Sequence, residues 1–441
     1  MISAKVTYFM KNLMINYIIR FRKMAFIQIG QKTLVSLFPF MMLVALTRII
    51  GASVFSPSGY INMLFSLSSW LPQFQTIGVF LTNFSSLLGG AVGLLTAYFS
   101  AKYTAGYYGK STGTVGITAF FFNLILYSRE LFTVPLNDGA LIKVHFPVAT
   151  NLIFAIIIGY LVGKIFNWTA SKSDEKIVDE QFDYQPKTIR PIFYSLALAV
   201  CLNFLLALAN YYNLFTIINQ FFSSFMTSKS NLIATFINTI FLSLFAWLGN
   251  SASFTNLQFT DDQYALSNLN YVLTNKSSVN IPFPYTQTTL YQGYGGFAGV
   301  GALLALVIAI LLVARNKKNK QVSLLSLFPA LFNNGAPMMV GIPIMLNVIY
   351  LIPFILIPMI NMLFAYGALA LKLIPPVVYP VPDGTPSVLY AFIGSGGSLR
   401  AFALGIFVFI IDVLIYIPFV KLNNRIQGDL LIEGEADVKT D

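Results

Sequence analysis

A broken apolar segment, Phe332–Asn347, holds the residues with the clearest chemical potential in this sequence. It lies in a run, residues 321–371, that has no charged side chain but contains four asparagines and several prolines. Backbone that faces lipid must satisfy its own hydrogen bonds, so a broken helix is tolerated only inside protein or beside a wet cavity. Paired breaks with polar residues at membrane depth form solute sites in transporters. The segment therefore predicts a small-solute site that includes Asn333, Asn334 and the backbone at Gly335.

Three ionisable side chains elsewhere are further candidates, each with a simpler alternative. Asp383 precedes Gly384 in a proline-rich segment, where it is either a carboxylate for proton transfer or an exposed turn residue. Asp412 lies in an apolar stretch, and an intramembrane acid is a functional candidate because its burial is costly. The alternative is a hydrogen-bonded contact between helices. His145, the only histidine, lies at the edge of an apolar segment, which favours an interfacial role.

The sequence offers no cofactor or metal site. Cys201 is the only cysteine, so an intramolecular disulfide and a cysteine-based metal site are excluded. The phosphate-binding loop, the dinucleotide fingerprint and the HExxH zinc motif are all missing from the sequence. We therefore expect neither a cofactor nor a metal, and ATP-driven pumping by this chain is disfavoured.

The composition is that of an integral membrane protein. Hydrophobic residues make up 56% of the chain and charged residues 10%, whereas soluble domains carry about 25% charged residues. The net charge of +11 does not predict nucleic-acid binding. The basic residues cluster at the edges of apolar segments, as expected for loops on the cytoplasmic side of a membrane.

The lengths of the apolar segments predict an all-α polytopic membrane protein with about ten transmembrane helices, since a helix needs about 20 residues to cross a bilayer. Residues 5–31 mix apolar and basic side chains and predict an amphipathic helix in the membrane surface. Ser323–Phe332 and Ser387–Gly397 are too short to span and predict re-entrant hairpins. Leu214–Thr227 is short and amphipathic. The expected spans are Leu34–Gly51, Ile77–Ala101, Val115–Ser128, Pro147–Ile165, Pro191–Tyr212, Asn231–Phe254, Gly295–Ala314, Ile344–Leu373 and Ala401–Val420.

Clusters of lysine and arginine predict the topology. Residues 1–31, residues 164–190 and Arg315–Lys320 are basic, so we expect all three on the cytoplasmic side. Three apolar segments lie between the second and third clusters, although an even number of crossings is required. Either one of these segments does not cross fully or Leu214–Thr227 does cross, and both alternatives stay open.

The charged stretch at residues 164–190 is also the best domain boundary. We expect an interfacial amphipathic helix at 1–31, an N-terminal membrane block at 32–163 and a cytoplasmic loop at 164–190. A C-terminal membrane block with the substrate pocket follows at 191–421, and a polar tail at 422–441.

Several segments, in the right order, resemble the lactose/cellobiose-type enzyme IIC, the membrane permease of the bacterial phosphotransferase system (PTS). In that family's signature segment, an asparagine–glutamate–proline triplet stands where this chain has Gly335, Ala336 and Pro337. Further similar segments are Phe297–Ala302, the pair Pro375 and Pro376, Gly396–Ala401 and Tyr416–Lys421.

The resemblance implies a multi-pass sugar permease of the bacterial cell membrane, for oligosaccharides of the cellobiose or lactose class. Members are homodimers and phosphorylate the sugar as it enters, using a phosphocysteine on a cytoplasmic enzyme IIB. A phosphohistidine on enzyme IIA recharges that subunit. This chain has no length to spare for such a carrier domain, so enzyme IIB and enzyme IIA are expected as separate partners. Membrane lipids complete the expected partners.

The resemblance also implies a pocket in which this chain departs from the family. The family's glutamate falls on Ala336 and its histidine on Asn250, and neither residue titrates near neutral pH. Asp383 and Gly384 replace a tryptophan and a threonine. The implied substrate-binding residues are Asn250, Asn333, Asn334, Gly335, Ala336, Pro337, Asp383 and Thr385. No catalytic residue is assigned, with Asp383 the first candidate for a relocated carboxylate. Asn333 either lines the site or caps the broken helix.

We expect the pocket to lie between Ser323–Phe332, Asn333–Pro337, Leu248–Ser253 and Asp383–Pro386. Two functions remain open: uptake coupled to phosphorylation, or a degenerate permease that acts as a facilitator or as a regulatory or interaction subunit. Loss of a positioned acid–base group costs about 10²–10⁴ in rate. We therefore expect this chain to phosphorylate sugar far more slowly than an ordinary member, and whether it is an enzyme stays open.

Overall fold

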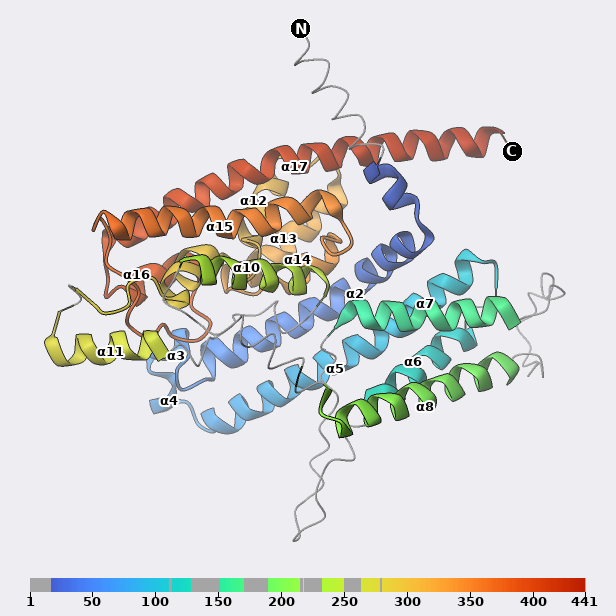
Figure 1. Cartoon of the computed structure of the whole chain (residues 1–441), viewed down its shortest axis with the longest axis horizontal. Coiled ribbons are helices and arrows are strands. Elements are labelled where there is room, and N and C mark those ends of the chain that lie inside the picture. Colours follow the sequence, from blue (N-terminus) through green and yellow to red (C-terminus); the bar gives the residue numbers. More distant parts are fainter. Residues whose placement is uncertain are drawn as a thin grey trace, which may run out of the picture.

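The elements of secondary structure are helices in the part of the chain that the computed structural model describes (Figure 1). That part comprises residues 17–110, 113–127, 151–169, 189–214, 217, 232–249, 263–277 and 280–440. The extended pairing within these ranges is a single isolated parallel bridge, between Gly59 and Asp383. Six of the described helices are long and apolar enough to cross a membrane, and three shorter apolar helices of 10–17 residues accompany them. The expected all-α membrane fold is confirmed.

The first half of the chain is a bundle around one long helix, α5 (Phe74–Tyr107). This helix packs against α2 (Ala25–Ile49), α6 (Gly113–Tyr127) and α7 (Leu152–Thr169), and α8 (Ile189–Tyr211) packs against α6 and α7. A π-helical turn, η1 (Ile50–Val54), extends α2, and the short helices α3 (Tyr60–Phe65) and α4 (Leu67–Trp70) follow it. Figure 1 shows α5, α6, α7 and α8 together at the lower right.

Small residues let α7 approach α5 closely. An added Cβ on Gly159 of α7 would lie 2.6 Å from Cβ of Ser100 on α5. Ser100 Oγ donates a hydrogen bond to the Ile156 carbonyl oxygen at 2.7 Å. Ala97 and Ala101 of α5 are fully buried in the same contact. Because lipid provides no hydrophobic drive between helices, close packing of small residues holds such pairs together.

The second half of the chain forms the larger buried core. α15 (Val348–Ala370) and α12 (Leu303–Val313) pack against α17 (Leu399–Thr440), and the π-helix η6 (Thr288–Gly295) packs against α15. α14 packs against α2 of the first half, which places the broken segment between the two halves. The remaining helices are α10 (Leu232–Trp247), α11 (Gln263–Asn275), α13 (Lys317–Leu331), α14 (Ala336–Gly341), η7 (Ser387–Leu389) and α16 (Tyr390–Gly394).

Each expected span contains a helix among its described residues, but several of these helices begin or end elsewhere. The segment expected to span from Gly295 to Ala314 becomes helical only at Leu303, after Gly299 and Gly301 adopt φ angles of 86° and 79°. At 1.5 Å per residue, α12 is about 16 Å long, against about 30 Å for the bilayer core. This length favours the alternative in which one of the three segments does not cross as a complete helix. Leu214–Thr227 lies almost entirely outside the described residues.

The two expected hairpins contain short helices. Ser323–Phe332 forms the end of α13, which begins earlier because the Asn316 side chain accepts a hydrogen bond from the Lys318 N–H at 2.9 Å. α13 packs against α14 across the break, so the two helices form a pair, and their re-entrant course in the membrane stays a prediction. Ser387–Gly397 contains η7 and α16.

The N-terminal region differs from a simple surface helix. The structure describes it from Tyr17 onward, the helix is interrupted at Met24, and the residues from Ala25 extend the first span. Arg22 is buried, and its Nη2 donates to Oδ1 of Asn347 at 3.2 Å and to Oδ1 of Asn423. These acceptors come from distant parts of the chain, which is why the sequence pattern alone placed Arg22 at the lipid surface.

The three basic clusters lie at one end of the molecule wherever they are described. Phe26, at the start of α2, packs against Tyr160 beside the second cluster, with ring centroids 5.3 Å apart. Asn424 of α17 donates to the carbonyl oxygen of Val313, just before the third cluster, at 3.1 Å. Because α17 also binds Arg22, these contacts link all three clusters. That this end faces the cytoplasm stays a prediction.

Candidate functional site

A cavity of about 830 Å³ lies where the two halves of the chain meet. Its walls are α2 with η1, the first half of α5, the start of α14 and the loop before η7. Small-molecule sites typically have volumes of roughly 300–1,000 Å³, so the cavity has room for a small solute. The polar and charged side chains on its walls include Arg48, Gln75, Thr82, Asn83, Ser85, Ser86, Asn334 and Asp383.

Asn334 and Ala336 line this cavity at the start of α14. Oδ1 of Asn334 accepts a hydrogen bond from the Ala336 N–H at 3.2 Å, which starts the helix as an N-terminal cap does. The amide nitrogen of Asn334 is not used in that contact and is a hydrogen-bond donor. Ala336 brings only a methyl group to the wall. The break therefore offers hydrogen-bonding groups here but no titratable one.

The neighbouring residues of the break shape its backbone. Asn333 adopts a φ of 63°, and its Oδ1 accepts a hydrogen bond from the Gly299 N–H at 2.6 Å. Of the two interpretations of Asn333, this contact favours the structural one. Gly335 is needed because an added Cβ would lie 2.7 Å from the Ala298 carbonyl oxygen. Pro337 occupies the first turn of α14, where its missing N–H costs nothing.

Sequence reasoning missed the wall that α5 provides. Gln75, Thr82, Ser86 and Gly89 follow one another at intervals of seven, four and three residues, so they share one helix face. The hydroxyls donate within the helix, Thr82 to the Gly78 carbonyl oxygen at 2.9 Å and Ser86 to that of Thr82 at 3.0 Å. Their lone pairs remain able to accept hydrogen bonds. This polar stripe in an apolar span is the signal that could have revealed the wall.

Arg48 was also missed, although it lies within an expected span. It belongs to the last turn of α2, and it and Asp383 are the two charged side chains among the described lining residues. Arginine inside a membrane segment is tolerated where it faces the protein interior or a water-filled cavity. Its planar guanidinium carries five N–H donors. Arg48 therefore gives the cavity a positively charged wall rich in donors.

Asp383 also lines the cavity, in a loop that docks onto the first half. The Asp383 N–H donates to the Ser58 carbonyl oxygen at 2.9 Å, and the Tyr60 N–H donates to the Asp383 carbonyl oxygen at 2.9 Å. Oγ of Ser58 donates to Oδ2 of Asp383 at 2.5 Å. Gly384 has a φ of 66°, and an added Cβ would lie 2.9 Å from Cα of Ser53. The carboxylate therefore helps to hold this loop in place.

The pocket was expected inside the second half, but most of the lining residues of the observed cavity come from the first half. Thr385 is buried, and its Oγ1 donates to the Pro382 carbonyl oxygen at 2.7 Å within its own loop. The expectation rested on segments that the resemblance equates with the family's site. It included no contact between α2 or α5 and the break, because such contacts join residues far apart in sequence.

The segment expected to carry Asn250 is described only in part. Gly249 accepts a hydrogen bond on its carbonyl oxygen from the N–H of Leu152 at 2.9 Å, and Leu152 lines the cavity. Asn250 itself lies outside the described residues, so its distance to Ala336 stays a prediction. His145 also lies outside them.

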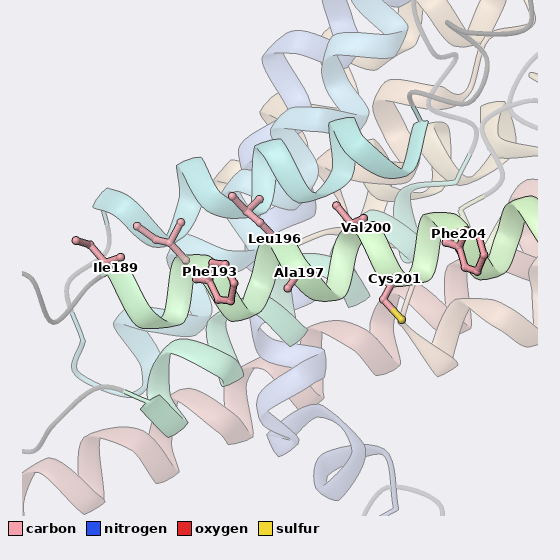
Figure 2. Close-up of a pocket in the computed structure, with 8 residues that line it drawn as sticks. Ile189, Phe193, Leu196, Ala197, Val200, Cys201 and Phe204 are labelled. Atoms are coloured by element: carbon pink, nitrogen blue, oxygen red, sulfur yellow. The ribbon is translucent and has the colours of Figure 1, made fainter.

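A second hollow, on the outer face of α8, lacks the chemistry of a polar solute site. Figure 2 shows its lining side chains, which all come from this one helix and include Phe193, Val200, Cys201 and Phe204. Cys201 is exposed there rather than packed inside a helix contact. With only apolar side chains and one thiol, this surface is suited to contact with lipid.

Comparison with known proteins identifies a family. The family model described as Phosphotransferase system, EIIC matches residues 31–358. The PTS system cellobiose-specific EIIC component of Lactococcus lactis subsp. lactis (strain IL1403) is 42% identical over 106 residues, which cover 24% of this chain and 22% of that protein. The PTS system lactose-specific EIICB component of Staphylococcus haemolyticus (strain JCSC1435) is 33% identical over 101 residues, covering 23% and 17%. These matches thus span about a fifth of the curated relatives' lengths.

Among solved structures, the comparison finds a match to the crystal structure of the transporter ChbC. It is the IIC component from the N,N'-diacetylchitobiose-specific phosphotransferase system, and the match covers 92% of this chain and 95% of that one. The sequence identity is 19% and the TM-score is 0.40.

Proposed function

This chain belongs to the phosphotransferase system EIIC family, and from that premise we propose that it is a sugar permease of the cellobiose and lactose class. It is a multi-pass membrane protein. The proposed substrate follows the names of its relatives, which are specific for cellobiose and for lactose. We place the sugar in the cavity between α2, α5 and α14.

The composition of the cavity wall carries this proposal. Asn334, at the break of the family's signature segment, lines the same cavity as the polar stripe of α5 and Arg48. A sugar hydroxyl both donates and accepts hydrogen bonds. The hydroxyl oxygens of Thr82 and Ser86 are acceptors for it, and the amide nitrogen of Asn334 and the guanidinium of Arg48 are donors. The apolar residues Val44 and Val79 complete the wall, as in most small-molecule sites.

Coupling to phosphorylation requires a phosphoryl donor. We propose that phosphorylated enzyme IIB delivers the phosphoryl group and enzyme IIA recharges it, with the permease acting as a homodimer among membrane lipids. Catalysis of phosphoryl transfer depends on positioning and on groups that balance developing negative charge. Arg48 is the cavity residue with that property. Asp383 is the carboxylate on the described cavity wall and the candidate acceptor for the hydroxyl proton, while Ser58 donates to its Oδ2.

A second function, facilitated passage without phosphorylation, has two specific observations in its favour. Ala336, at the position of the family's glutamate, lines the cavity with a methyl group, and the carboxylate of Asp383 accepts a hydrogen bond from Ser58. Sugar binding needs neither residue to titrate, whereas proton removal from the hydroxyl does. Binding without efficient phosphoryl transfer is therefore the expected behaviour of a facilitator.

The two functions are distinguished by measuring binding and phosphoryl transfer on the same protein. Purified chain in lipid vesicles is titrated with cellobiose and lactose, and phosphoryl transfer is assayed with phosphorylated enzyme IIB of a related system. We expect binding together with slow transfer, and the double variant Ala336→Glu with Asn250→His should raise the transfer rate by about 10²-fold or more. The control omits enzyme IIB.

Three outcomes decide between the possibilities. Phosphoryl transfer by the unaltered chain at the rate of an ordinary family member would show that another group performs the chemistry. The variant Asp383→Asn then tests whether Asp383 is that group. Binding without transfer, in both the unaltered chain and the double variant, supports the facilitator. Absence of binding across a panel of glucosides and galactosides would contradict a sugar permease altogether.

A further inference from the structure

The core of the second half contains an acid that does not line the sugar cavity. Asp412 lies on α17 and is fully buried, as is Asn361 on α15. Nδ2 of Asn361 donates to Oδ2 of Asp412 at 2.8 Å and to the main-chain oxygen of Tyr294 at 3.2 Å. Tyr294 belongs to η6. The Asp412 carboxyl group and the Asn361 amide therefore join α15, α17 and η6 in the interior.

A count of hydrogen-bond donors and acceptors at this interhelical contact leaves two acceptor atoms without a donor. The two contacts of Asn361 Nδ2 use both hydrogens of its amide group. Oδ1 of Asp412 and Oδ1 of Asn361 are both buried and have no hydrogen-bond partner among the described residues. An ionised carboxylate and an amide oxygen can only accept, so these two atoms cannot pair with each other. A single proton on Asp412 turns its Oδ1 into a donor and supplies both atoms with a partner.

In the part of the chain that the structure describes, the elements packed against α17 around Asp412 carry no positive charge that would stabilise the ionised form. The elements packed against α17 here are α12, α15, α16, η6 and η7, and none of their sequences contains lysine, arginine or histidine. On α17 itself, Lys421 is nine residues away, roughly 13 Å along the axis at 1.5 Å per residue, and Arg400 is farther. The titratable groups on these elements are tyrosines, neutral near pH 7: Tyr291, Tyr294, Tyr350, Tyr366, Tyr390 and Tyr416.

We propose that Asp412 is a proton-binding site, in which the neutral acid donates from Oδ1 to Oδ1 of Asn361 while Nδ2 of Asn361 donates to Oδ2 of Asp412. A carboxylic acid and a primary amide pair in this way through two hydrogen bonds. A buried carboxylate without a cation is costly in a membrane, and taking up a proton removes that cost. The bound proton thus fastens α17 to α15 without burying a charge. This role is separate from sugar transport, because neither residue lines the cavity.

Infrared spectroscopy tests the protonation state directly. The full chain is purified into lipid vesicles at about pH 7. This pH is some three units above the usual aspartate pKa of about 3.9. We expect a carbonyl stretch of a protonated carboxyl group that shifts in D₂O, disappears in Asp412→Asn and persists in the control Asp383→Asn. Identical spectra of the unaltered chain and Asp412→Asn in this region would overturn the proposal.

Thermal unfolding of two variants provides an independent test. In Asp412→Asn the new amide N–H can donate in place of the acid O–H, so the melting temperature should shift by less than about 2 °C. Asp412→Leu leaves the Asn361 groups unpaired and should melt several degrees lower or fail to accumulate. Equal destabilisation by both substitutions would show that the carboxylate itself is required.

A bound metal cation is the competing occupant of these oxygens, and a sodium titration distinguishes it. Under the proposal, the melting temperature of the unaltered chain does not depend on sodium at constant ionic strength maintained with choline. If sodium stabilises the unaltered chain but not Asp412→Asn, the site binds a cation, and the proposal that Asp412 binds a proton is refuted.

Discussion

The two halves of α5 use similar side chains for different purposes. In the second half of the helix, Ser100 donates to the Ile156 carbonyl oxygen at 2.7 Å and Thr104 to that of Ser100 at 2.7 Å, and both side chains are fully buried against α7. In the first half, Thr82 and Ser86 also donate to backbone oxygens but line the cavity. Residue type alone therefore does not distinguish a hydroxyl in a helix contact from a hydroxyl on the cavity wall. What separates them is whether a partner helix covers the hydroxyl.

The glycines around α5 show the same difference. Gly159 of α7 lies against the backbone and side chains of α5, and an added Cβ would come within 2.6 Å of Ser100 Cβ. Gly89, on the cavity half of α5, has no atom within 4 Å of the position of an added Cβ. Glycine therefore permits close contact in one region and keeps space open in the other.

The largest expected effect comes from filling the packed contact. Gly159→Leu forces the α5 and α7 backbones apart and should destabilise the protein by about 3 kcal/mol or more, measured by thermal unfolding in detergent or vesicles. Gly89→Leu is the matched control, since it should keep the melting temperature and weaken sugar binding by narrowing the cavity. Equal melting temperatures of the two variants would contradict the conclusion that Gly159 lies in a packed helix contact and Gly89 beside open space.

The next effect concerns the charge in the cavity. Arg48→Leu removes charged donors from the wall and should weaken sugar binding about 10–100-fold, as expected for hydrogen bonds from a charged group. Arg48→Lys keeps the charge but loses the planar guanidinium group. Its affinity for sugar should therefore lie between that of the unaltered chain and that of Arg48→Leu. Calorimetric titration measures both. Unchanged affinity in Arg48→Leu would show that the guanidinium does not reach the solute.

A smaller effect is expected from a single hydroxyl on α5. Thr82→Val keeps the shape and removes one hydrogen bond to the sugar, which should weaken binding about 3–10-fold. Thr104→Val makes the same chemical change in the packed half of α5 and should leave the affinity unaltered. Comparable losses of affinity in the two variants would mean that the substitution acts through helix stability.

The smallest effect is expected at the docked loop. Ser58→Ala removes the hydroxyl that donates to Oδ2 of Asp383 at 2.5 Å but keeps the backbone contacts with the loop. Because Ser58 is exposed, we expect about a 2–5-fold change in affinity and no change in melting temperature. If phosphoryl transfer rises in Ser58→Ala and falls again in the double variant with Asp383→Asn, the released carboxylate takes part in the chemistry.

The membrane helices and the break at 332–347 were predictable because their signals are local. A span is read from a run of apolar residues of about 20, and a break from proline, glycine and asparagine within such a run. That reasoning singled out Asn334 and Ala336, and both line the cavity. The role of each as a ligand for sugar stays a prediction.

The cavity walls from the first half could not be predicted in the same way. Arg48 was counted as part of a span, and the stripe that includes Thr82 was not separated from other small polar residues in apolar helices. Arg22 was expected at the lipid surface, yet Asn347 and Asn423 bind it in the interior. The residues that bind Arg22, and those that complete the cavity with Arg48 and Thr82, lie far away in sequence. No local sequence pattern identifies them.

The sequence by itself determined that this protein is a helical membrane protein of the phosphotransferase system EIIC family, and it determined where one spanning segment is broken. Hydrophobicity, charge placement and helix-breaking residues act over a few turns of chain, so they can be read without the fold. Only the tertiary structure decided that α2 and α5 complete the cavity, that Ser58 holds Asp383, and that Asp412 meets Asn361. These are contacts between segments that lie far apart in the sequence, and they depend on how the helices pack together.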